Sequence, residues 1–444
     1  MPELNTAHGK DPYGGSRVLY IIDATLEYFV AIITAGAYLA KLTSTLGISD
    51  SLTGILTSFV SLGGFFSLFS ALVMKKKPVR NKVAIIQIIC QLAFVVLFLT
   101  PCFDIANNIA VLIFCAAFLV GYALYYLLYT IKADWYMGLV PTETRGNFTA
   151  IINVVSLSTG MMFSFVMSLI IEYYDGIGSA RGFLIASAII MGVIGLLRVL
   201  TVFFSKEKPS EDASGEDASL LEMSKSLFRN KRFVALLIFF SLYFVARYIS
   251  HPFYGTYQIN ELGFSMIYVS VITVVQMLAR ILGTIVFGKL GDKASFNTVL
   301  NLTCIMFAAS LAVITFTTPA NGHVMFMIYT VLDAIMLGGM SICQVNSIFE
   351  VVGQNERSAA ISLKYSLTGL IGFLATLAVS PLVSLIQDVG FTLFGMTVYA
   401  QQIVSALALV IAIGSIIYMN FAILAPKARA VKSAAEGSEP EIKD

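Results

Sequence analysis

Two long apolar runs of the chain are joined by the stretch Phe287-Gly288-Lys289-Leu290-Gly291-Asp292-Lys293. Its two glycines let the backbone turn sharply and let neighbouring helices approach closely. Its lysines suit the anionic cytoplasmic surface of a membrane, and its aspartate can accept hydrogen bonds from the free N–H groups at the start of a neighbouring helix. The stretch therefore predicts a very short turn between two membrane-spanning helices.

The composition is that of a polytopic membrane protein. Of the 444 residues, 58% are hydrophobic and 12% are charged, and the mean hydropathy is +0.85. A soluble protein carries about 25% charged residues. The five cysteines are scattered and include no Cys-x-x-Cys pair, so we expect neither a disulfide framework nor a metal site.

Apolar runs predict twelve transmembrane helices, because backbone polar groups in hydrocarbon need partners within their own segment. The runs lie near 18–42, 51–74, 82–100, 107–130, 147–170, 182–204, 232–258, 265–288, 295–317, 324–349, 358–386 and 396–422. With both termini cytoplasmic, only Lys41 and Arg181 fall on outer loops, whereas Arg247 and Arg280 fall within spans. The other basic residues fall on the inner side of the membrane or near the inner ends of helices. This asymmetry predicts a multi-pass protein of the cell membrane with cytoplasmic N and C termini.

An internal repeat indicates two six-helix bundles. Residues 46–49 (LGIS) and 262–265 (LGFS) precede the second and eighth spans at an offset of 216. Residues 140–146 (VPTETRG) and 352–358 (VGQNERS) enter the fifth and eleventh spans at an offset of 212. We expect an N-terminal bundle over 1–204, a cytoplasmic linker with an amphipathic helix over 205–231, a C-terminal bundle over 232–425 and a cytoplasmic tail over 426–444.

The pattern Gly-x-Leu-Gly-Asp-Lys at 288–293 resembles the loop signature of the major facilitator superfamily. The loop that contains Asp134, Pro141, Arg145 and Gly146 resembles the family's loop between spans 4 and 5. The resemblance implies an all-α fold of two pseudo-symmetric six-helix bundles, a central cavity lined by spans 1, 4, 7 and 10, and secondary transport by alternating access.

The signature also predicts a conformational latch. We expect Asp292 to lie near the start of the eleventh span, where helix N–H groups and the Arg357 guanidinium favour a carboxylate. The first-half copy of the signature is eroded, since Lys76 stands at the position of Asp292, so the latch is expected to be one-sided. The predicted latch residues are Gly288, Gly291, Asp292, Lys293, Arg145 and Arg357.

Polar residues inside the spans mark the candidate substrate cavity, because a charge in a membrane usually faces a bundle interior or water. The fourth span carries tyrosines at positions i, i+3, i+4 and i+7, which form one helix face. Arg280, within the eighth span, is interpreted as a structural partner of a neighbouring helix, and His251 as either a cavity residue or a polar helix-end residue. The predicted cavity residues are Arg247, His251, Asp333, Tyr122, Tyr125, Tyr126, Tyr329 and Gln276.

Asp23 and Glu27 lie four residues apart on the first span, hence on one helix face. We predict that Glu27, with Asp23 as helper, takes up and releases a proton, because burial disfavours the ionised carboxylate. The repeat places Arg247 about 6 Å outward of Glu27, so Arg247 is expected to pair with Glu27 in one state, with Asp333 as the competing partner. In one alternative, Asp23 lies at the inner surface and is merely solvated. In another, Glu27 and Arg247 form a permanent bridge, and sodium or no ion drives transport.

The sequence favours a transporter over an enzyme. Its three histidines form no H-E-x-x-H motif, and the G-x-x-x-x-G-K pattern at 283–289 is followed by Leu290 where a phosphate loop needs Ser or Thr. We expect a small polar organic solute, such as a sugar or a related metabolite, driven by a proton gradient. The alternatives are proton-driven efflux of amphipathic compounds and, remotely, a membrane enzyme or sensor. We expect a monomer in the lipid bilayer, with no cofactor, metal or nucleic-acid partner.

Overall fold

A computed structural model gives the fold and describes residues 12–67, 79–103, 105–141, 144–207, 220–293, 296–353, 356–393 and 396–424. The predicted tail over 426–444 and residues 208–219 of the predicted linker lie outside these residues. The described chain is almost wholly helical, as the apolar runs predict.

The first half of the chain forms helices that are broken near the second predicted span. They are α1 (Gly14–Ile33), α2 (Gly36–Thr45), α3 (Asp50–Ser58), η1 (Phe59–Leu62), α4 (Gly63–Ser67), α6 (Arg80–Leu99), η2 (Thr100–Cys102), α7 (Asn107–Met137), α8 (Arg145–Gly176) and α9 (Ala180–Phe204). The first predicted span is a bent pair, since α1 and α2 meet at 51°. Gly36, with φ of 54°, supplies the backbone conformation at this bend.

The second half begins with the short helix that the linker pattern predicts. Its elements are α10 (Leu220–Arg229), α11 (Lys231–Tyr248), η4 (His251–Phe253), α12 (Tyr254–Thr256), η5 (Tyr257–Glu261), α13 (Met266–Lys293), α14 (Phe296–Thr315), α15 (Gly322–Phe349), α16 (Arg357–Val389), β1 (Phe391–Leu393), β2 (Met396–Val398), α17 (Ala400–Tyr418) and η7 (Met419–Leu424). Pro252 coincides with the break in the seventh span, because proline removes a helix hydrogen bond.

Two expectations about the loops are wrong. The stretch 287–293 forms the last turns of α13, which runs to Lys293, so it is not a turn outside the helix. The last predicted span, over 396–422, begins inside a β-hairpin in which Phe391 pairs with Val398, and its helix starts only at Ala400. Alternation of Phe391, Thr392 and Leu393 is too short to distinguish a strand from a helix end by pattern alone.

Ten helices of the described chain are long and apolar enough to cross a membrane, or eleven if the bent α1–α2 pair is one span. The predicted span over 51–74 corresponds to α3, η1 and α4, and its last residues lie outside the described chain. Large apolar side chains are exposed on the bundle surface, among them Leu112, Met162, Leu196 and Val410. Such a surface suits lipid rather than water.

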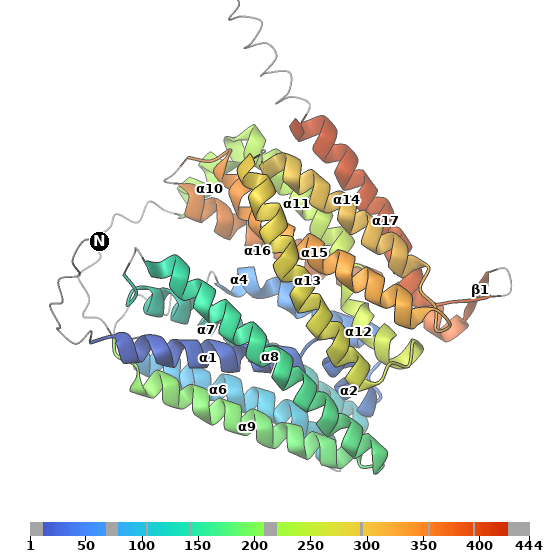
Figure 1. Cartoon of the computed structure of the whole chain (residues 1–444). Coiled ribbons are helices and arrows are strands. Elements are labelled where there is room, and N and C mark those ends of the chain that lie inside the picture. Colours follow the sequence, from blue (N-terminus) through green and yellow to red (C-terminus); the bar gives the residue numbers. More distant parts are fainter. Residues whose placement is uncertain are drawn as a thin grey trace, which may run out of the picture.

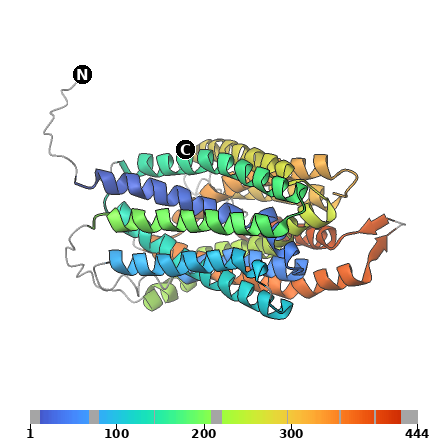
Figure 2. The ribbon, with the colours of Figure 1, turned by 90° about the horizontal axis from the view of Figure 1, so that it is seen from below.

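The helices form two groups that converge at one end of the molecule. In Figure 1, α1, α6, α8 and α9 lie on one side and α11, α14, α15 and α17 on the other. Figure 2 shows the start of α1 and the β-hairpin at opposite ends of the long helices. We call the end that holds α10 the linker end and the end that holds β1 and β2 the hairpin end. The ribbons of the two halves diverge toward the linker end (Figure 1).

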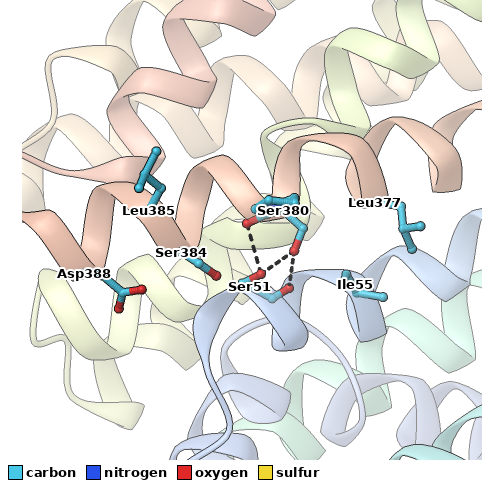
Figure 3. A pocket seen from close by; sticks show the side chains of 8 residues that line it. Ser51, Ile55, Leu377, Ser380, Ser384, Leu385 and Asp388 are labelled. Atoms are coloured by element: carbon cyan, nitrogen blue, oxygen red, sulfur yellow. Dashed lines mark hydrogen bonds between the residues drawn. The ribbon is translucent and has the colours of Figure 1, made fainter.

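Hydrogen bonds and one close helix approach join the two halves near the hairpin end. The Ser51 and Ser380 hydroxyls each donate to the other residue's carbonyl oxygen, at 3.0 and 3.1 Å (Figure 3). A Cβ added to Gly369 of α16 would lie 2.0 Å from the Ser61 carbonyl oxygen, so glycine is what allows this approach. The Asp50 carboxylate of α3 accepts from three amides of the second half, those of Asn260, Gln387 and Gln401. Polar and close-packed contacts therefore hold the hairpin end together.

Candidate functional site

Four charged side chains of the first half meet between α1, α7 and α9, and we call them the ion quartet: Asp23, Glu27, Lys132 and Arg198. The Lys132 Nζ donates to Asp23 Oδ2 at 2.6 Å and to Glu27 Oε2 at 3.2 Å. The Arg198 Nε donates to Asp23 Oδ1 at 3.2 Å, and its Nη2 contacts Glu27 Oε2. The two negative and two positive charges balance within one cluster.

The ion quartet is almost closed to solvent. The Asp23 side chain is 0% exposed and the Glu27 side chain 7%. Asp23 also accepts from the Thr201 hydroxyl at 3.4 Å, whereas Glu27 Oε1 has no hydrogen-bond partner among the described residues. Because buried charges are costly unless paired and hydrogen-bonded, Glu27 is the less satisfied of the two carboxylates.

These positions correct part of the sequence interpretation. Asp23 is buried, so it is not a solvated residue of the inner surface. Lys132 and Arg198 were counted among the basic residues inside or near inner helix ends, but both are buried beside the carboxylates. Lys132 lies just beyond the predicted end of the fourth span at 130, but α7 continues to Met137. Arg198 interrupts the apolar run 182–204 and could have been found by the rule that identified Arg247.

In the second half, Arg247 of α11 pairs with Asp333 of α15. The Nη1 and Nη2 atoms donate to Oδ1 at 2.9 Å and to Oδ2 at 3.4 Å, which is a bidentate geometry. The expected Glu27–Arg247 pair is therefore absent from this conformation, and the competing partner Asp333 holds the guanidinium. The Arg247 side chain is 12% exposed and that of Asp333 is 2% exposed. This ion pair is thus more accessible at its cationic side.

Aromatic and polar residues surround the Arg247–Asp333 pair. The Tyr329 ring, one turn from Asp333 on α15, packs edge-on against Tyr254 with 5.2 Å between the centroids. His251 lies half-buried at the break after α11, with its ring 5.9 Å from that of Tyr254. Gln276 of α13 is also half-buried. The predicted cavity residues of the second half thus lie on four elements, α11, η4, α13 and α15. The rings of His251 and Tyr329 both approach that of Tyr254.

The tyrosine face of α7 is graded rather than uniform. Tyr122 is buried and donates to the Thr34 carbonyl at 3.0 Å, so it partners a backbone oxygen at the α1–α2 break. Because irregular backbone in a membrane must find internal partners, Tyr122 has a structural task in this conformation, and its role in the cavity stays a prediction. Tyr125 and Tyr126 are half-buried and Tyr129 is exposed. The face therefore opens toward the last turns of α7.

Lys364 is a buried residue that the sequence interpretation missed. It lies on α16, and its Nζ contacts the Gln344 side-chain oxygen of α15. Three aromatic rings surround the ammonium group, with centroids at 3.6 Å for Tyr365, 5.0 Å for Phe240 and 5.6 Å for Phe244. Lys364 stands seven positions from Arg357 in the apolar run that was predicted as the eleventh span, which is a signal that could have revealed it.

The predicted latch residues are only partly described. Gly288, Gly291 and Lys293 lie in the last turns of α13, but the Asp292 side chain lies outside the described part of the structure. Arg145 begins α8 and donates through Nε to the Val140 carbonyl at 3.2 Å. Arg357 begins α16 and places its guanidinium 4.5 Å from the centroid of the Phe349 ring. The contact between Asp292 and the start of α16 remains a prediction.

Comparison with known proteins agrees with this architecture. Residues 21–376 match the family model described as Major Facilitator Superfamily. A crystal structure of a mutant of the nucleoside transporter NupG has a TM-score of 0.70 at 14% identity, over 92% of this chain and 100% of that chain. A D-xylose-proton symporter has a TM-score of 0.65 at 13% identity, over 90% and 96%.

A third solved structure is also similar, whereas no curated protein matches the sequence. A bacterial homologue of the human lysosomal transporter Spinster, in an inward-facing and occupied conformation, has a TM-score of 0.61 at 13% identity, over 92% and 95% of the two chains. These similarities confirm the all-α polytopic fold, and twelve helices are consistent with it. The chain therefore belongs to the Major Facilitator Superfamily and is a multi-pass membrane transporter, not an enzyme.

Proposed function

We propose that this protein couples the movement of a small polar organic solute to a proton gradient by alternating access. The observation that carries the proposal is the ion quartet, in which Glu27 has an unpartnered oxygen and slight exposure while Asp23 is fully closed off. Glu27 is therefore the carboxylate with an oxygen free to take up a proton, and Asp23 is the anchor of the two cations. The solved D-xylose-proton symporter of similar fold supports this class of mechanism.

Protonation of Glu27 would change what holds α1 in place. In the ionised state, Glu27 Oε2 binds both Lys132 on α7 and Arg198 on α9. A neutral carboxyl group attracts both cations less, so Asp23 alone would have to neutralise them. The contacts of α1 with two neighbouring helices then weaken together, which is a local charge change acting on a bistable element. If Glu27 proves dispensable for proton-driven accumulation, sodium becomes the alternative coupling ion.

The Arg247–Asp333 pair is the proposed polar contact for the solute. It presents both charge signs near Tyr329 and His251, and the Arg247 side chain is partly exposed. Hydroxyl, amide or ring-nitrogen groups of a small solute can exchange hydrogen bonds with such a pair. A sugar or a related metabolite fits this chemistry, and the nucleoside transporter of similar fold points to the same size class.

We also propose that the linker end faces the cytoplasm of the cell, with both termini on that side. Basic residues support this orientation, since Arg229, Lys231 and Arg232 cluster where α10 meets α11. The divergence of the two halves toward this end would then be an inward-facing arrangement (Figure 1). The working unit is proposed to be a monomer in the bilayer, without a cofactor.

The test begins with a ligand screen and continues with one substitution. Thermal unfolding of the purified protein against sugars, carboxylates, nucleosides and cationic amphipaths identifies a ligand, because binding stabilises the folded state. In proteoliposomes, Glu27→Gln should abolish proton-driven accumulation of that ligand and retain its counterflow. The control Asp175→Asn, in an exposed ion pair with Lys41, should accumulate the ligand normally.

Two results would count against this proposal. Accumulation by Glu27→Gln with the pH dependence of the unaltered protein would show that Glu27 does not carry the proton. Stabilisation by cationic amphipaths alone, together with proton-driven extrusion of them, would replace solute transport by efflux of amphipathic compounds.

A further inference from the structure

Lys364 occupies an unusual site for a cation inside a membrane protein. Its side chain is buried, and no carboxylate of the described residues lies within salt-bridge distance of its Nζ. The described surroundings offer the side-chain oxygen of Gln344 and the faces of three aromatic rings. The other buried cations of the described core, Lys132 and Arg198, each contact two carboxylates. Lys364 is thus the buried cation that has aromatic partners in place of acidic ones.

The surroundings of Lys364 satisfy its charge only in part. An ammonium group has three N–H donors, and the hydrogen bond to Gln344 engages one of them. Aromatic faces attract a desolvated cation, but they do not neutralise it. Because a charge in the membrane interior is costly unless paired, the site lacks a negative charge that a ligand could bring.

The position of Tyr365 gives a ligand a way in. Its ring covers the Lys364 Nζ, with 3.6 Å to the centroid, and the residue itself is 37% exposed. The same stretch of α16 faces the other half of the molecule, since the Ser366 hydroxyl donates to the Gly64 carbonyl of α4 at 3.0 Å. A turn of the Tyr365 side chain would therefore expose the ammonium group near the junction between the halves.

We propose that Lys364 binds the negatively charged group of the transported solute, with Gln344 orienting the ammonium group and Tyr365 as a movable cover. The proposal rests on the transport function proposed above and narrows its substrate to a small polar organic monoanion, such as a sugar acid. The carboxylate would pair with Lys364. Arg247, one helical turn beyond Phe244 on α11, is placed to bind the hydroxyl groups of the same solute.

The experiment compares neutral solutes with their acids. Thermal unfolding of the full-length purified protein is followed with D-glucose against D-glucuronate, D-xylose against D-xylonate and glycerol against D-glycerate. At least one acid should raise the unfolding temperature and its neutral partner should not. If every neutral solute stabilises the protein as much as its acid, or if no acid stabilises it, the assignment is overturned.

Substitutions then locate the binding. Lys364→Met should weaken binding of the acid at least tenfold, Lys364→Arg should retain part of it, and the control Arg280→Gln, an exposed cation on α13, should bind normally. Lys364→Met should also unfold at the same or a higher temperature without ligand, because its surroundings are aromatic. Acid binding that is unchanged in Lys364→Met overturns the proposal, whatever the stability of the unliganded variant.

The outcome also separates this proposal from the transport function. Proton-driven accumulation of the neutral sugars, with no response to the acids, would overturn the role of Lys364 and leave the proposed function intact. Binding of an acid through Lys364 without any proton movement in proteoliposomes would support the anion site and count against proton coupling.

Discussion

Lys132 and Lys364 are two buried lysines in corresponding layers of the two halves, yet the protein accommodates them differently. The repeat offset of 212 places Gln344, the partner of Lys364, at the position of Lys132. Lys132 contacts the carboxylates of Asp23 and Glu27, whereas Lys364 lies among aromatic rings. The first half therefore neutralises its buried cations internally, whereas the second half leaves Lys364 without an anionic partner among the described residues.

This difference suggests a division of labour between the halves. A balanced, closed cluster such as the ion quartet responds to a single proton, because the loss of one charge unbalances all four residues. An unbalanced site such as Lys364 responds to a charged ligand instead. Experiments that remove one charge at a time from each site can break or sharpen this comparison.

The largest effect is expected from Asp23→Asn. This change leaves two buried cations facing one carboxylate, and breaking a buried ion pair costs about 3–5 kcal/mol of unfolding free energy. The double variant Asp23→Asn with Lys132→Met should recover much of this loss, since it restores the balance of charge. Thermal or denaturant unfolding in a fixed lipid environment measures both. Equal stability of Asp23→Asn and the unaltered protein would contradict the role of the ion quartet.

A smaller loss is expected from Arg247→Met. It strands the buried Asp333 carboxylate, but Arg247 is partly exposed and solvent already screens the pair, so we expect about 2 kcal/mol. Adding Asp333→Asn removes the stranded charge and should restore stability. If the double variant were less stable than Arg247→Met alone, the two side chains would not be acting as a pair.

The exposed pair Lys41–Asp175 gives the scale of a surface interaction. Its atoms are 2.7 Å apart, but the two side chains are 24% and 43% exposed. Lys41→Gln should therefore lower the unfolding free energy by only about 0.5 kcal/mol, an effect that added salt diminishes. A loss as large as that of Asp23→Asn would mean that exposure does not separate these ion pairs.

The smallest loss is expected from Lys364→Met. Replacing a buried ion by an apolar side chain of similar length is often neutral or stabilising when no partner charge is left behind. Here no carboxylate would be stranded among the described residues, so unfolding should occur at the same or a higher temperature. A marked loss of stability would show that Lys364 has an anionic partner in the folded protein, and the comparison with Lys132 would fail.

The sequence predicts the fold well because membrane spans are long and their apolar runs are continuous. The positions of Asp23, Glu27, Arg247 and Asp333 could be read as intramembrane charge by the same reasoning. What could not be predicted is which charges pair, because Lys132 and Arg198 reach Glu27 from spans that are distant in sequence. The pairing of Arg247 with Asp333 in this conformation likewise depends on side-chain packing between α11 and α15.

The sequence pattern also could not predict where tertiary contacts override local residue preferences. Tyr122 belongs to the tyrosine face of α7, but the break at Gly36 draws its hydroxyl to the Thr34 carbonyl. The last turns of α13 contain Gly288 and Gly291, which suggest a turn, yet the helix continues to Lys293. In each case tertiary contacts outweigh the local preference of the residues.

Difference infrared spectroscopy tests the central claim, that Glu27 carries the proton, most directly. When the purified protein is taken from mildly alkaline to mildly acidic pH, the band of a buried protonated carboxyl group should appear. It should be lost in Glu27→Gln and kept in Asp175→Asn. A band that persists unchanged in Glu27→Gln, or the absence of any such band in the unaltered protein, would contradict the account.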